Sequence, residues 1–176
     1  KCLVFYPPDD TPEMRDRQER QLLRLSDACR KTRHELLVEV IVPPDMPGDA
    51  MTVARAIRRL YAIGIYPDWW KLEPVDDPAA WRNIAAAITE NDPHCRGVVL
   101  LGLSTPMQQL IASFDAAAAV DIVKGFAVGR TIFYDVAREW MRGAISDADA
   151  VDALAERFSL LVEAWRNARA GVGKAA

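Results

Sequence analysis

Residues 34–43 read HELLVEVIVP, a short apolar run that follows a helical pattern and stops at a proline. The run is rich in β-branched residues, as strands are. Alternate valines share one face, which suits packing under helices, whereas Glu39 lies on the opposite face. A carboxylate in mid-strand is expensive to bury without a partner. We therefore predict a strand from Leu36 to Val42 with Glu39 facing a partner group.

Four more apolar segments of this kind occur, and a long helical pattern follows each of the five. Successive strand starts lie roughly thirty residues apart, the size of a βα unit. Strands that alternate with helices imply a parallel sheet covered by helices. The other predicted strands are Cys2 to Tyr6, Trp69 to Glu73, Gly97 to Gly102 and Gly125 to Gly129.

The predicted helices begin with a repeated device, a residue suited to the N-cap followed by proline. The pairs are Thr11-Pro12, Asp77-Pro78 and Thr105-Pro106. Two helices are predicted over Pro12 to Arg33 and Ala50 to Ala62, and Ser146 with Asp149 resembles a capping box that opens a helix to about Ala168.

No linker, low-complexity tract or charge block divides residues 1–176, so we predict a single domain or part of one. Two architectures fit: a complete, open, doubly wound sheet, or a segment of a (β/α)8 barrel, which needs about 250 residues when whole. The absence of GxGxxG and GxxxxGK[ST] loops weakens the nucleotide-binding open sheet. Because the chain starts inside an apolar run without methionine, we interpret it as a piece of a longer polypeptide.

The composition is that of an ordinary globular protein, with 51% hydrophobic and 27% charged residues. A net charge of -3 and the lack of a basic, aromatic-rich stretch argue against a nucleic-acid partner. No apolar run approaches the roughly 18 to 20 residues that span a membrane. Three cysteines without a CxxC pair, and only two histidines, favour a reducing cytoplasm and argue against a metal centre.

Charged side chains recur on one face of the first three predicted strands. Lys1 stands at the start of the first strand, Glu39 lies in the second, and Lys71 lies in the third with Trp69 and Glu73 on its side. A neighbouring cation and partial burial lower the pKa of a lysine, so Lys71 can attack a carbonyl while Glu39 moves protons. A buried Lys–Glu pair that ties neighbouring strands together fits the spacing equally well.

Glycines and an arginine close the last two predicted strands. Gly129 allows a ligand close to the backbone, and Arg130 can hold a phosphate bidentately. Gly102, which ends the preceding strand, can offer backbone amides to the same anion. Barrel phosphate sites frequently follow the seventh and eighth strands. The alternative is a tight left-handed turn with a solvated arginine.

Three stretches together resemble one known family: GFAVGRTIF at 125–133, PDWWKLE at 67–73 and LVE at 37–39. The family is the aldolase-like domain (DUF2090 type) found C-terminal to 5-dehydro-2-deoxygluconokinase in bacterial inositol-catabolism fusion proteins. It is similar, more distantly, to class I tagatose-bisphosphate aldolases. The resemblance runs from Lys1 to about Arg169, and GFAVGR is its most specific part.

The resemblance implies that the chain supplies about strands four to eight of a TIM barrel. Lys71 then matches the Schiff-base lysine on strand six, Glu39 the strand-five carboxylate and Lys1 the strand-four lysine. Gly129 and Arg130 match the strand-eight phosphate site. The implied reaction cleaves 6-phospho-5-dehydro-2-deoxy-D-gluconate to dihydroxyacetone phosphate and malonate semialdehyde, with no cofactor and no metal.

The chain departs from the family pattern in two places. The first three strands, with their strand-one acid, are absent, and Gly102-Leu103-Ser104 stands where related domains often carry a Gly-Arg-Gly-like turn. Two other functions therefore stay open: a non-catalytic phosphosugar-binding or assembly domain beside a fused N-terminal kinase, and a complete five-stranded module with structural lysines. The strand edges of an incomplete barrel are also compatible with a homo-oligomer.

Overall fold

The computed structural model describes residues 1–9, 11–43 and 48–175 and shows an α/β fold. One parallel sheet contains five strands in the order β1-β2-β3-β4-β5, so each strand pairs with its neighbour in the chain. The predicted parallel, sequential sheet is confirmed, and the reversed order of a doubly wound sheet is contradicted. The strands are β1 (Cys2–Phe5), β2 (Leu37–Ile41), β3 (Trp69–Leu72), β4 (Gly97–Leu100) and β5 (Val123–Phe126).

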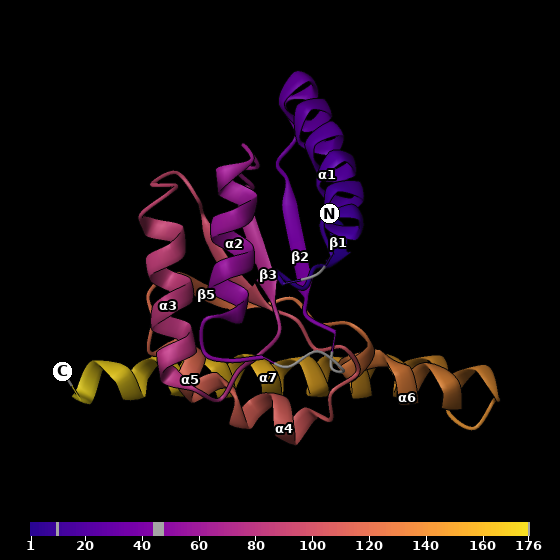
Figure 1. Ribbon diagram of the computed structural model, residues 1–176. Helices are drawn as coiled ribbons and strands as arrows, with labels where there is room; N and C mark the ends of the chain where they lie inside the picture. Colours follow the sequence, from indigo (N-terminus) through magenta and orange to yellow (C-terminus); the bar gives the residue numbers. More distant parts are fainter. Residues whose placement is uncertain (10, 44–47, 176) are drawn as a thin grey trace.

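Helices connect the strands and follow the last one. They are α1 (Pro12–Thr32), α2 (Thr52–Ala62), α3 (Pro78–Thr89), α4 (Met107–Ala112), α5 (Phe114–Ala118), α6 (Arg130–Met141) and α7 (Asp147–Ala175). Helices α2 and α3 pack side by side along the sheet, and α7 crosses the bottom of the view, where it contacts α4, α5 and α6 (Figure 1). Within the described ranges, no helix combines the length and apolar character that crossing a membrane requires.

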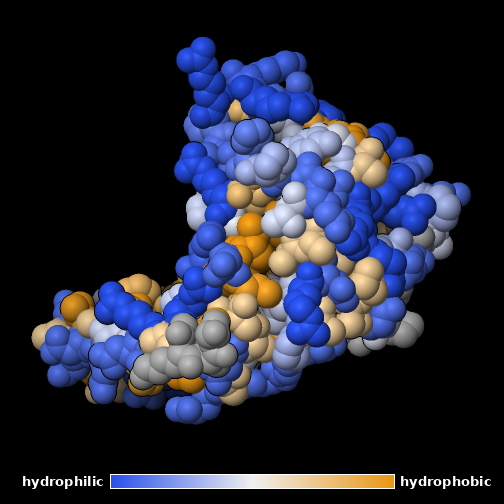
Figure 2. Space-filling model, turned by 90° about the vertical axis from the view of Figure 1, so that its left-hand side faces the viewer, coloured by the Kyte–Doolittle hydropathy of each residue, from blue (hydrophilic) through white to orange (hydrophobic). Residues whose placement is uncertain are grey.

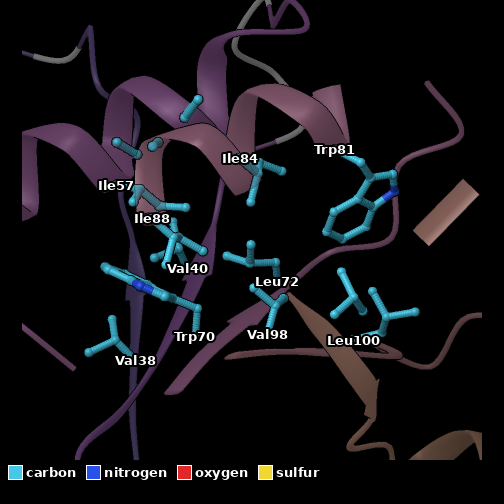
Figure 3. Close-up of a cluster of buried hydrophobic side chains, with 14 of the residues drawn as sticks. Val38, Val40, Ile57, Trp70, Leu72, Trp81, Ile84, Ile88, Val98 and Leu100 are labelled. Atoms are coloured by element: carbon cyan, nitrogen blue, oxygen red, sulfur yellow. The ribbon is translucent and has the colours of Figure 1, made fainter. Parts of the chain in front are cut away.

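The core lies between one face of the sheet and helices α2 and α3 (Figure 3). Strand alternation sends every second side chain to this face, and each fully buried one stabilises the fold by about 1.5–3 kcal/mol. The indole Nε1 of Trp70 donates a hydrogen bond to the Tyr61 hydroxyl at 2.9 Å, so the largest core side chain keeps its polar atom paired. The labelled core residues from the sheet are Val38, Val40, Trp70, Leu72, Val98 and Leu100, and those from the helices are Ile57, Trp81, Ile84 and Ile88.

The opposite face of the sheet is more open. The register sets Leu3, Glu39, Lys71, Val99 and Gly125 in one row across the strands. Leu3 is 38% exposed, so an apolar side chain on this face meets solvent. Figure 2 shows the molecule hollowed between its upper part and the arm at its lower left, with hydrophobic surface inside the hollow.

A buried carboxylate, that of Glu19, ties α1 to two other elements. Tyr6, just after β1, donates its hydroxyl to Oε1 of Glu19 at 2.5 Å. Arg59 of α2 donates Nε to Oε1 at 2.9 Å and Nη2 to Oε2 at 2.8 Å. The hydrogen bond from Arg59 holds the pKa of Glu19 below its ordinary value against the opposing effect of burial. Burial raises the pKa of Tyr6, so this phenol stays protonated and donates.

The caps agree with the sequence at three helices and differ at a fourth. Thr11 takes the N-cap position of α1, directly before Pro12. Asp77 caps α3 by accepting the Ala79 N–H at 2.8 Å. The capping box of α7 is confirmed, since the Ser146 hydroxyl and the Asp149 carboxylate each accept the other's N–H at 3.2 Å. The prediction of a Thr105 cap is wrong. The Thr105 N–H bonds to Gly102 O in a turn, and Pro106 takes the N-cap position before α4.

The last predicted strand lies too far along the chain. Residues Val123–Phe126 form β5, whereas the prediction ran from Gly125 to Gly129. The register shifts between Val98 and Val99 opposite this strand, and Gly129 becomes the N-cap of α6. The chain must leave the sheet after Phe126 to reach that helix, so the apolar residues 127 and 128 serve as a connection.

Candidate active site

The carboxylate of Glu39 lies between two lysine amines. Its Oε2 accepts a hydrogen bond from Lys1 Nζ at 2.7 Å, and its Oε1 lies 3.3 Å from Lys71 Nζ. The register pairs Glu39 directly with Lys71 across β2 and β3, which fixes this contact. The side chains of Glu39 and Lys71 are 5% and 15% exposed, against 53% for Lys1. The structure therefore brings the three predicted charged residues together on the more open face of the sheet.

The charge state of Glu39 follows from these neighbours. Burial acts to raise the pKa of the carboxyl, but the hydrogen bond from Lys1 and the charge of Lys71 outweigh it and hold the pKa below its ordinary value. Glu39 is thus a carboxylate at neutral pH and can accept a proton from either amine. Lys71, the more sheltered amine, is the better placed of the two to react away from bulk water.

A cleft of about 260 Å³ contains this centre. Its size approaches the lower end of the range for small-molecule sites. It is lined by all six predicted site residues, Lys1, Glu39, Lys71, Gly102, Gly129 and Arg130, and completed by Leu3, Leu103, Ser104, Ala127, Val128, Thr131 and Phe133. The predicted anion-binding residues and the predicted reactive lysine therefore face one space.

One side of the cleft is formed by the start of α6. Gly129 is the N-cap and offers no side-chain cap, so the first N–H groups of the helix have no side-chain acceptor there. Arg130 is the first helical residue, and its guanidinium forms no hydrogen bond or ion pair with the described residues. A cation at a helix N-terminus is electrostatically unfavourable alone. A bound anion would satisfy both the N–H groups and the guanidinium.

Both predicted glycines are places of close packing. A Cβ on Gly102 would lie 2.9 Å from Thr131 Oγ1 and 3.0 Å from Val128 Cγ1. A Cβ on Gly129 would lie 3.0 Å from the ring of Phe133. The Thr131 hydroxyl also donates to Thr105 O at 3.1 Å, which joins the loop after β4 to the first turn of α6. The glycines therefore let the two anion-facing segments approach each other.

Sequence reasoning missed the seven other residues that line the cleft, and four of them show the reasons. Leu103 and Ser104 have φ values of 41° and 66°, a left-handed conformation that costs non-glycine residues about 1–2 kcal/mol each. Strain of this kind concentrates at functional sites. Thr131 and Phe133 follow Gly129 within one helical turn, so a helix start predicted at residue 130 would have indicated them. No sequence signal indicates the turn, because Leu-Ser is a poor pair for it.

The charged cleft is not accompanied by a metal-binding cluster: across residues 1–9, 11–43 and 48–175, no three His, Cys, Asp or Glu side chains gather around one point.

The search of curated proteins found no match. A family model described as "Uncharacterized protein conserved in bacteria (DUF2090)" matches residues 1–169, nearly the same span as the resemblance in the sequence. The match includes the strands that carry Glu39 and Lys71 and the start of α6. The chain therefore belongs to the DUF2090 family.

Proposed function

We propose that this chain is a class I (Schiff-base) aldolase domain that cleaves a phosphosugar through Lys71. The observation that carries the proposal is the Glu39 carboxylate, which lies between two amines in a cleft. The same cleft contains Arg130 at a helix start, whose guanidinium pairs with none of the described residues. The sequential parallel sheet supports the finer proposal that the chain forms strands four to eight of a (β/α)8 barrel. Lys71 stands near the carboxyl end of β3, where barrel enzymes place catalytic groups.

The residues divide the chemistry as follows. The neutral amine of Lys71 attacks the ketone carbon, and the carbinolamine loses water to form an imine. Glu39 accepts the proton that Lys71 releases and returns it to the leaving hydroxyl. Lys1 holds Glu39 through its 2.7 Å hydrogen bond and keeps the carboxylate oriented toward Lys71. The N–H groups at the start of α6 and the guanidinium of Arg130 bind the substrate phosphate.

The proposed substrate is 6-phospho-5-dehydro-2-deoxy-D-gluconate, and the products are dihydroxyacetone phosphate and malonate semialdehyde. This places the domain in inositol catabolism in the cytoplasm, beside a fused N-terminal kinase. The family model that matches residues 1–169 is the family that the sequence resembles, and the substrate and pathway are proposed from that resemblance. The chemistry uses lysine and carboxylate groups and calls for no metal.

A trapping experiment tests the proposal in the full-length protein. Sodium borohydride with the ketose phosphate should add one reduced adduct, located by mass spectrometry on the peptide that contains Lys71. Lys71→Met should abolish both adduct and turnover, while Lys124→Met, at an exposed lysine of β5, should change neither. An adduct on Lys1 would agree with an aldolase but would make Lys1 the Schiff-base lysine in place of Lys71. Cleavage that leaves no adduct and stops when a chelator is added would show a metal enzyme instead.

The second candidate is a non-catalytic phosphosugar-binding or assembly domain. The observation that favours it is the ion pair itself, because a Glu39–Lys71 distance of 3.3 Å also fits a structural tie between β2 and β3. Phosphosugar affinity without turnover or trappable adduct would support this candidate.

A further inference from the structure

We propose that a second copy of this chain docks on an apolar groove between α6 and α7, with α6 of each copy packed against α7 of the other. The inference goes beyond the proposed reaction and does not depend on it. Helices α6 and α7 contact each other as a hairpin that extends past the sheet at the lower right of Figure 1. Several large apolar side chains of this hairpin are exposed.

The groove has a volume of about 490 Å³ and a fixed shape. Seven of its eight lining side chains are apolar, and the eighth, Asp147, accepts a hydrogen bond from Trp140 Nε1 at 2.7 Å. Toward the other end of the hairpin, Arg157 of α7 donates Nη1 to the Ile132 carbonyl of α6 at 2.9 Å. Because both bonds join α6 to α7, the surface is formed before a partner arrives. Association then costs less conformational entropy.

The exposed apolar side chains of the hairpin occur in pairs that lie seven residues apart. The pairs are Phe133 with Trp140, Tyr134 with Met141, and Val151 with Phe158. Residues at this spacing lie on one face of a helix, and the spacing is typical of helices that pack along other helices. The pattern therefore favours a helical partner over a small molecule or an extended peptide.

The area of this surface suits a stable dimer. Each of the six side chains is at least 45% exposed. A whole aromatic side chain has about 150–250 Å², so the six together offer roughly 500–700 Å² to a partner. A standard interface buries about 800 Å² of each partner, polar rim included. Two hairpins that pack face to face, with the charged residues beside the groove, reach this size.

The charges along the hairpin favour a second copy as that partner. Helix α6 with its C-cap residue carries three arginines and two carboxylates, whereas residues 147–160 of α7 carry four carboxylates and one arginine. A two-fold axis that places α6 of each copy beside α7 of the other sets opposite charges together twice. Two exposed charges flank the apolar rows: Arg138 lies 6.0 Å from the ring centroid of Tyr134, and Asp152 follows Val151.

The groove also adjoins the candidate active site. Phe133 lines both the groove and the cleft that contains Lys71. Its ring lies 3.0 Å from the point where a Cβ on Gly129 would stand, at the start of α6. A copy seated in the groove therefore contacts a residue that forms a wall of the cleft.

Sedimentation velocity of the purified protein at micromolar concentration should give the mass of a dimer. Val151→Glu places a charge at an exposed position of the groove, so we expect dimer formation to weaken by at least roughly 10-fold. Leu160→Glu is the matched control, because Leu160 is also exposed on α7 but does not line the groove. This control should sediment as the wild type does. Circular dichroism should show equal helix content in all three proteins.

Charge reversal tests whether the partner is a second copy. Arg138→Glu or Asp152→Arg alone sets like charges together at both contacts of α6 with α7, so each variant should dimerise roughly 10- to 100-fold more weakly. An equal mixture of the two variants restores opposite charges at both contacts. We therefore expect the mixture to form mixed dimers with the affinity of the wild type.

Three results would overturn the proposal. A monomeric wild-type protein would leave the groove to another segment of the polypeptide or to a different partner. Equal effects of Val151→Glu and Leu160→Glu would place the interface elsewhere. Charge variants that each dimerise like the wild type, or whose mixture stays monomeric, would exclude the packing of α6 against α7.

Discussion

Replacing Glu39 with glutamine should destabilise the protein measurably at neutral pH. Among the described residues, Glu39 is the only ion-pair partner of Lys71, whose side chain is 15% exposed, and the change removes its charge. Removing one partner of a buried ion pair costs about 3–5 kcal/mol. The ammonium of Lys1 is half exposed and is hydrated once Glu39 is replaced. We therefore expect the free energy of unfolding to fall by about 2–3 kcal/mol. For a chain of this size that corresponds to a melting temperature lower by about 4–12 °C.

The effect should depend on pH in a defined direction. The folded-state pKa of Glu39 is lowered, so its contribution is fully present above its unfolded pKa of about 4.3. The contribution disappears as pH falls through the folded-state pKa. Urea unfolding of Glu39→Gln and wild type should therefore differ at pH 7 and converge in acid. Glu35→Gln, at an exposed ion pair with Arg96, should change stability by less than about 1 kcal/mol. Equal stability of Glu39→Gln and wild type at pH 7 would refute the reasoning.

Three further changes test the surroundings of the site. Gly102→Ala should destabilise by about 1–3 kcal/mol in urea unfolding, because its Cβ would press on Thr131 and Val128, whereas Gly171→Ala, with open space around it, should be neutral or stabilising. Arg130→Ala should weaken inorganic phosphate binding by roughly 10- to 100-fold in calorimetry, and Arg142→Ala, at the other end of α6, should not; equal affinities would contradict the anion site. Asp77→Ala should cost about 1 kcal/mol through the lost cap of α3, and an unchanged melting temperature would contradict that cap.

Much of the site could be predicted because strand alternation is a short-range property. Once β2 and β3 are recognised, the faces of Glu39 and Lys71 follow, and sequential parallel pairing sets them opposite each other. The placement of Gly102, Gly129 and Arg130 at one cleft could be predicted for a similar reason. Glycine allows a close backbone approach and arginine suits an anion wherever a strand ends and a helix begins, so these residue types indicate such a place.

The remaining features depend on packing between distant residues. The left-handed turn at Leu103 and Ser104 is held by Gly102 and by the Thr131 hydroxyl, which come together only in the folded sheet. The helix after this turn starts at Met107, one residue later than the predicted start at Pro106. The hydrogen bond from the Val42 N–H to the Glu73 carboxylate likewise joins residues that lie 31 positions apart in the chain. The local sequence pattern carries no information about contacts between residues that are distant in the chain.

The sequential order of the sheet also has a consequence for synthesis on the ribosome. Every strand pairs only with strands that are adjacent in the chain, so no paired strand must wait for a distant segment to emerge. Each βα unit can dock on its predecessor in turn, N-terminal part first. Each pairing joins strands that start roughly thirty residues apart, the span of one βα unit, so it can form soon after that unit is complete. The Glu39–Lys71 pair then forms when the third strand docks, before β4, β5 and the start of α6 complete the cleft around it.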